Sequence, residues 1–122
     1  PRGVGCVLLL WVGTPPTATC DFTTTAFNAS DRDYDFLVDT LEKQFGRLDG
    51  ILHNAGILGE RVELAHYPTE VWDDVMAVNL RAPFALTQAL LPLLQKSENA
   101  SVVFTSSGVG REARALWGAY SV

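Results

Sequence analysis

Two hydroxyl side chains near the end of the chain, Ser107 and Tyr120, are of types that can take part in acid–base chemistry. Ser107 follows a short β-rich run at 102–104, and Tyr120 comes thirteen residues later. In open α/β sheets, ligands bind just outside the carboxyl ends of the strands, where such hydroxyls can bond to a bound oxygen atom. Strands also end in Ser, Thr and Gly because these residues form turns, so this strand end alone equally fits an ordinary turn.

A second apolar run and a helix-like segment carry matching features. Residues 48–52 form an apolar run that closes in the small polar turn 53–56, which reads His-Asn-Ala-Gly. Residues 71–94 are largely apolar and helix-like, yet they contain Asn79. A buried asparagine without hydrogen-bond partners costs on the order of 1–3 kcal/mol, so we expect Asn79 to have specific partners.

Together these motifs resemble those of the short-chain dehydrogenase/reductase family, in its compact single-domain branch. The turn 53–56 is similar to the family's Asn-Asn-Ala-Gly turn, and Asn79 is similar to its active-site asparagine. Ser107 and Tyr120 have the spacing of the family's catalytic serine and tyrosine. The resemblance covers residues 19–122.

The resemblance implies an α/β fold, namely a partial Rossmann-like, doubly wound parallel sheet with flanking helices. It further implies that the first strand and the C-terminal part of that fold are missing. Residues 1–122 would then form a single partial NAD(P)-binding domain, with residues 1–17 outside the family match.

By the same resemblance, the chain is an NAD(P)-dependent oxidoreductase that transfers hydride between a nicotinamide cofactor and a carbonyl or alcohol substrate. NADP is slightly favoured over NAD. Ser107 would hold the carbonyl oxygen, with Ser106 as the second choice, and Tyr120 would exchange the hydroxyl proton. Asn79 would hold a water in a proton relay. The residues implied to contact the cofactor are Asp21, Asn54, Ala55 and Gly56, and His53 is expected to support the turn rather than to act as a base.

Two features depart from the family pattern. The glycine-rich turn that lets a backbone approach a pyrophosphate should follow the first strand, but Gly3 and Gly5 precede the apolar run 7–12. The family's lysine, four residues after the tyrosine, would lie at position 124, beyond Val122. We therefore expect little or no turnover from this chain alone. The alternative is an inactive fragment or pseudoenzyme that binds no dinucleotide.

Composition excludes several other classes of function. The net charge of −5 and the pI near 4.8 argue against nucleic-acid and anionic-membrane partners. Cys6 and Cys20 have no metal-ligand spacing and are expected to be free thiols in a reducing cytoplasm. The apolar run 4–12 imitates a secretory signal, although we favour a buried strand at 7–12. We expect a cytoplasmic, metal-free protein that acts on a small molecule and whose full-length form is a homo-oligomer.

The remaining expectations concern the elements that position these residues. Ser30 is predicted to cap a helix with an apolar stripe, and Gly46 is predicted to end it. Thr69 is predicted to cap the long helix, and Pro83 and Pro92 to break or kink it. The run 102–104 is predicted to be a buried strand.

Overall fold

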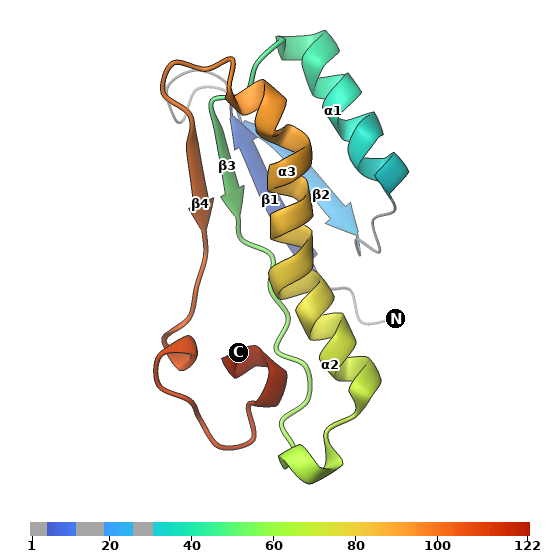
Figure 1. Cartoon of the computed structure of the whole chain (residues 1–122), viewed down its shortest axis with the longest axis vertical. Helices are drawn as coiled ribbons and strands as arrows, with labels where there is room; N and C mark the ends of the chain where they lie inside the picture. Colours follow the sequence, from blue (N-terminus) through green and yellow to red (C-terminus); the bar gives the residue numbers. More distant parts are fainter. Residues whose placement is uncertain (1–4, 12–18, 26–30) are drawn as a thin grey trace.

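The structure is a computed structural model that describes residues 5–11, 19–25 and 31–122 (Figure 1). The expectations for Gly3, for Val12 and for the cap Ser30 fall outside the described residues. The described strands form one sheet, and the helices lie beside it.

The sheet has four strands in the order β2-β1-β3-β4. They are β1 (Gly5–Trp11), β2 (Thr19–Thr25), β3 (Gly50–His53) and β4 (Ser101–Phe104). Strands β3 and β4 pair in parallel, as the sequence predicted.

Strand β1 departs from the prediction of a parallel sheet because it runs antiparallel to both β2 and β3. Only residues 12–18 connect β1 to β2. A parallel connection needs a crossover of a dozen or more residues, so this short link permits only a hairpin. In the hairpin Cys6 is paired with Thr24 and Cys20 with Leu10. Four ladder positions of about 3.3 Å each separate the two cysteines, which is too far for a disulfide.

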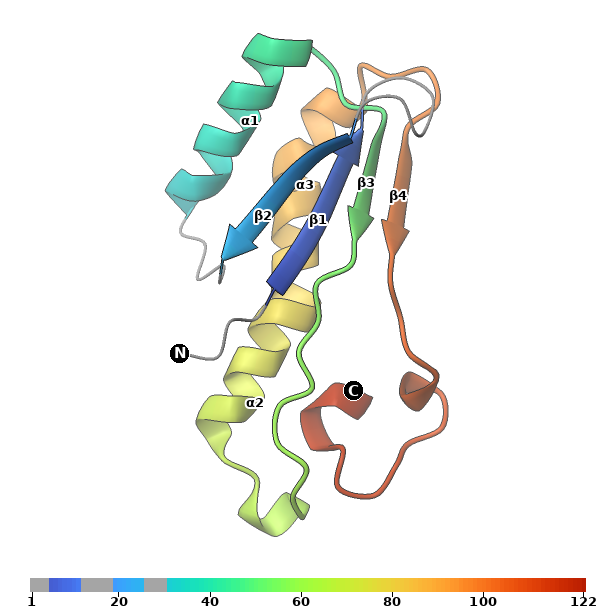
Figure 2. The same cartoon turned by 180° about the vertical axis from the view of Figure 1, so that it is seen from behind.

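Helices α1 (Asp31–Phe45) and α3 (Ala82–Leu94) lie on one face of the sheet, as the opposite views in Figures 1 and 2 show. Helix α2 (Thr69–Met76) continues the line of α3 beyond the ends of the strands. Within the described residues the other face carries no helix, so this part has one of the two helical layers of a doubly wound fold. The core lies between α1, α3 and β3. Its buried side chains are those of Tyr34, Leu37, Leu41, Leu48, Ile51, Leu86, Leu90, Leu93 and Leu94.

Helix α1 ends where the sequence predicted. Gly46 has a φ of +70° and donates its N–H to the carbonyl of Glu42 at 2.9 Å, which is the left-handed termination that glycine adopts without strain. Phe45 is 38% exposed because it is the last helical residue and lies beyond the core. The Glu42 carboxylate accepts a hydrogen bond from Lys96 at 2.6 Å, which lowers the pKa of Glu42 and ties α1 to the end of α3.

The long helix begins one residue earlier than predicted. The carbonyl of Pro68 accepts the first helical bond from Trp72 at 3.1 Å, so Pro68 is the cap and Thr69 is already helical. The chain stays helical to Leu94 across both prolines, with Pro92 inside α3. The helix departs from α-helical geometry in one segment, the π-helical η2 (Ala77–Arg81), where the N–H of Ala82 donates to the carbonyl of Ala77. It ends just before Pro83.

Residues 69–94 also meet the length and apolarity of a membrane span, with a mean hydropathy of 1.2. Core helices of globular proteins meet the same criteria, and this finding therefore assigns no membrane role.

Strand β4 is not buried, contrary to prediction. Val102, Val103 and Phe104 are between 37% and 55% exposed. The cause is position, since β4 is an edge strand with β3 as its only neighbour in the described sheet.

Candidate active site

The candidate site lies where β3 and β4 end side by side. The N–H of Thr105 donates to the carbonyl of His53 at 2.8 Å, which continues the parallel pairing one residue past β4. The Thr105 hydroxyl donates to Oδ1 of Asn54 at 2.8 Å. Two segments far apart in the sequence, the 54–56 turn and residues 105–107, therefore leave the sheet together (Figure 1).

His53 supports this edge from inside the structure. It is 5% exposed, and its ring stacks on Phe104 with centroids 4.8 Å apart. Nε2 of His53 lies 2.8 Å from the hydroxyl of Thr87, whose single hydrogen is donated to the Pro83 carbonyl. The His53 Nε2 must therefore carry a hydrogen and donate it. Burial lowers the pKa of His53, so the ring is held neutral as a structural donor.

Asn79 joins the turn after β3 to the long helix. Its Oδ1 accepts the N–H of Ile57 at 2.8 Å, and its Nδ2 donates to the Ile57 carbonyl at 2.9 Å. The expected polar partners of Asn79 are thus the two backbone groups of one residue. Asn79 lies in the π-helical segment η2, and such segments are frequent at functional sites. Pro83 has no N–H, so the ordinary α-helical bond to the Asn79 carbonyl cannot form.

Ser107 is half-buried at the start of a short 3₁₀-helix, η3 (Gly108–Gly110). Its Oγ accepts the N–H of Val109 at 3.5 Å, a long bond that orients the oxygen and leaves the hydroxyl hydrogen free to donate. Ser106 and Ser107 both line the cleft described below. Neighbouring side chains of a strand point to opposite faces, but β4 ends at Phe104, so this alternation does not separate the two serines.

Tyr120 lies in the 3₁₀-helix η4 (Gly118–Ser121). Its ring meets that of Trp117 edge to face, with centroids 5.9 Å apart. Leu116 precedes this helix with a φ of +71°, a conformation that costs energy in a residue with a side chain. Gly118 leaves no space for a side chain, since a Cβ there would lie 2.5 Å from Cε2 of Tyr67. Tyr67 therefore forms the surface on which the Tyr120 segment rests.

One cleft of about 320 Å³ collects most of the residues that the sequence singled out. The full lining is Asn54, Ala55, Gly56, Asn79, Thr105, Ser106, Ser107, Gly110, Tyr120 and Val122.

Asp21 does not lie at a strand end as predicted. Strand β2 continues through Thr25, since β-branched threonines favour extended pairing. Asp21 is paired with Leu9, which is paired on its other side with Leu52. Two strand spacings, about 10 Å, thus separate the backbones of Asp21 and Leu52.

Sequence reasoning missed three residues that shape this site. Thr105 was visible as the first residue after the strand. Thr87 could have been suspected from its place four residues after Pro83, where a threonine hydroxyl reaches the carbonyl. Tyr67 gave no signal, because its neighbours Gly59 and Gly118 are distant in sequence. Among the residues whose side chains are described, no three His, Cys, Asp or Glu side chains cluster as metal ligands.

Comparison with known proteins assigns the chain to a family. The model of the family described as short chain dehydrogenase matches residues 17–122. The chain belongs to the short-chain dehydrogenase family.

Individual relatives support the same assignment. The chain is 55% identical over 85 residues to the uncharacterised oxidoreductase YciK of Escherichia coli K12, covering 70% of this chain and 34% of that protein. The crystal structure of the short chain dehydrogenase from Shigella flexneri superposes with a TM-score of 0.75 at 47% identity, covering 82% of this chain and 39% of that one. A short chain dehydrogenase structure from Escherichia coli CFT073, complexed with NADPH, has a TM-score of 0.75 at 49% identity, covering 82% and 42%. The chain thus spans about a third of the length of the curated relative it matches.

Proposed function

We propose that this chain carries the nicotinamide side and the reacting groups of an NAD(P)-dependent oxidoreductase that interconverts a carbonyl compound and an alcohol. The observation that carries the proposal is the single cleft lined by Asn54, Asn79, Ser107 and Tyr120. The NADPH in the similar Escherichia coli CFT073 structure favours NADP(H) over NAD(H).

The 54–56 turn fits a flat cofactor ring. Ala55 and Gly56 bring little side-chain volume to the cleft wall, and a Cβ at Gly56 would meet only Oδ1 of Asn79, at 3.7 Å. Asn54, Ala55 and Gly56 would hold the nicotinamide end, and Asp21 is proposed for the adenine end. When bound, the cofactor supplies or accepts the hydride.

The chain's own groups handle the oxygen and the proton. The free hydroxyl hydrogen of Ser107 donates to the substrate oxygen, which fixes the carbonyl at the junction of β4 and η3. The phenol of Tyr120 gives its proton to that oxygen during reduction.

In this proposal Asn79 holds a water that passes a proton toward Tyr120. Ile57 engages one N–H and one oxygen lone pair of the Asn79 side chain, and the main-chain carbonyl of Asn79 is proposed to hold the water. That carbonyl cannot receive the ordinary helical bond because residue 83 is proline.

The test is NADPH binding by the chain, followed by the fluorescence of the cofactor. Gly56→Val should abolish saturable binding, because the new side chain fills the cleft while its Cβ makes only an ordinary contact with the protein. Gly108→Val is the matched control, since Gly108 has open space around it and does not line this cleft. Tyr120→Phe should keep binding and remove whatever carbonyl reduction the chain supports. A folded chain with no saturable NADPH binding would overturn the proposal in favour of an inactive piece.

We also propose that the full-length protein is cytoplasmic and self-associates. Exposed apolar side chains follow one face of the long helix, at Leu80, Phe84 and Leu91, with exposures of 65%, 65% and 46%. Phe84 and Leu91 are two helical turns apart and share a face, and apolar stripes of this kind are typical of helix–helix contacts between subunits.

A further inference from the structure

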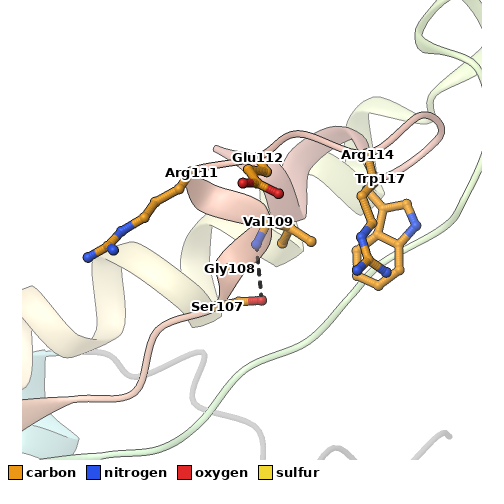
Figure 3. Close-up of a pocket in the computed structure, with 7 residues that line it drawn as sticks. All are labelled: Ser107, Gly108, Val109, Arg111, Glu112, Arg114 and Trp117. Atoms are coloured by element: carbon orange, nitrogen blue, oxygen red, sulfur yellow. Dashed lines mark hydrogen bonds between the residues drawn. The ribbon is translucent and has the colours of Figure 1, made fainter.

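A second cleft, of about 410 Å³, opens next to the first. Ser107 is the one residue that lines both clefts. Because the two clefts share Ser107, a molecule seated in the second cleft would adjoin the first cleft at that residue. The other lining residues are Gly108, Val109, Arg111, Glu112, Arg114 and Trp117 (Figure 3).

The charge of this second cleft is positive. Its lining has two cations, Arg111 and Arg114, against the single anion Glu112. The ion pairs formed by the described side chains lie elsewhere, and none involves either arginine. This excess contrasts with the net charge of −5 of the whole chain.

Arg114 is held beside the reacting groups. Its guanidinium lies over the ring of Trp117, 5.4 Å from the centroid, and Trp117 in turn contacts Tyr120. Figure 3 shows Arg114 alongside Trp117, whereas Arg111 projects away from both. A guanidinium stacked on an indole keeps its N–H edge free and loses part of its conformational freedom, which favours bidentate binding of an anion.

We propose that the second cleft selects carbonyl substrates bearing an anionic group, a carboxylate or a phosphate. The carbonyl oxygen lies at Ser107, the body of the substrate lies along Trp117, and the anionic group pairs with Arg114. This substrate class rests on the function proposed for the first cleft, although the binding step itself needs no cofactor.

The test uses two matched pairs of probes and the chain of residues 1–122. Levulinate is compared with methyl levulinate, and dihydroxyacetone phosphate with dihydroxyacetone; the pairs distinguish a carboxylate from a phosphate. Binding is followed without cofactor through the indole N–H signal of Trp117 in nuclear magnetic resonance spectra, assigned with Trp117→Phe. We expect at least one anionic probe to bind about tenfold or more tightly than its neutral partner, the lower range for a charge-assisted hydrogen bond.

Arg114→Gln should remove this preference and leave the weak binding of the neutral probes unchanged. Lys43→Gln is the charge control, because Lys43 is exposed on α1, at the far end of the molecule (Figure 1). Equal affinities for both members of each pair in the unsubstituted chain would overturn the inference, as would an anion preference that survives Arg114→Gln. Loss of NADPH binding with anion selection intact would overturn the proposed function alone, so the two failures are distinguishable.

Discussion

The two hydrogen bonds between Asn79 and Ile57 make the sharpest test of how the site is built. Asn79→Ala removes both and leaves the N–H and the carbonyl of Ile57 without their partners. Each bond contributes about 0.5–1.5 kcal/mol, so the pair accounts for roughly 1–3 kcal/mol of stability. Asn79 is half-buried, which allows water to replace part of the loss. We therefore expect a decrease of about 1–2 kcal/mol in the free energy of unfolding.

The same reasoning predicts a local effect that unfolding measurements alone would miss. The amide of Ile57 should exchange its hydrogen about 5- to 30-fold faster in Asn79→Ala, since a loss of about 1–2 kcal/mol of local protection corresponds to factors of this size. Asn79→Asp separates the two bonds, because a carboxylate still accepts from the Ile57 N–H but repels the Ile57 carbonyl.

Urea unfolding and hydrogen exchange would measure these effects, with Asn99→Ala as the control. Asn99 is exposed near the end of the long helix, and its side chain makes no described hydrogen bond. An Asn79→Ala chain that unfolds at the same urea concentration as the control and keeps a protected Ile57 amide would refute the role assigned to Asn79.

Three further predictions follow from other contacts. Burial lowers the pKa of His53 below its ordinary value of 6.5, so on acidification the unfolded chain binds the proton before the folded chain does. The free energy of unfolding should therefore decrease as the pH drops from about 6.5 through the pKa of the folded chain, by at most about 1.4 kcal/mol per pH unit. Urea midpoints measured across this window should lose that slope in His53→Asn, and an unchanged slope would contradict the assignment. Gly118→Ala should destabilise the chain because its Cβ collides with Tyr67, whereas Tyr67→Phe should be neutral or stabilising in urea unfolding, since the buried Tyr67 hydroxyl has no hydrogen-bond partner. Phe84→Glu should shift self-association toward the monomer in sedimentation, and an unchanged distribution would exclude the helix stripe as the contact.

The sequence predicted which residues would meet in one cleft, but not how every strand pairs. Strand ends, spacing and the family resemblance pointed to the 54–56 turn, Asn79, Ser107 and Tyr120, and these line one cleft because the carboxyl ends of parallel strands share one edge. Their roles in binding and catalysis stay predictions. Helix α1 was also readable, since its stripe and Gly46 are local signals. These features depend on residues close together in the chain, or on strands whose connection is long enough for a parallel crossover, and both can be read from the sequence.

The pairing of β1 was not read as antiparallel, although the short link 12–18 carried the information. An apolar run specifies a strand but not its direction, and direction depends on the length of the connection. Asp21 was expected near the end of a strand, whereas β2 continues beyond it through Thr25. The exposure of β4 was unreadable, since an apolar strand has the same composition at an edge as in the centre of a sheet.

The placement of Tyr120 shows most clearly what spacing cannot reveal. The thirteen-residue interval from Ser107 is compatible with many paths, and the observed one includes Leu116 at a φ of +71°. Tyr67, wedged between Gly59 and Gly118, holds the end of that path against α2. Tyr120 is therefore positioned by a phenol fifty-three residues earlier in the chain, through two glycines whose role only the packed structure shows. Since the Trp117 contact links this segment to Arg114, the same packing sets both the proposed proton donor and the proposed anion site.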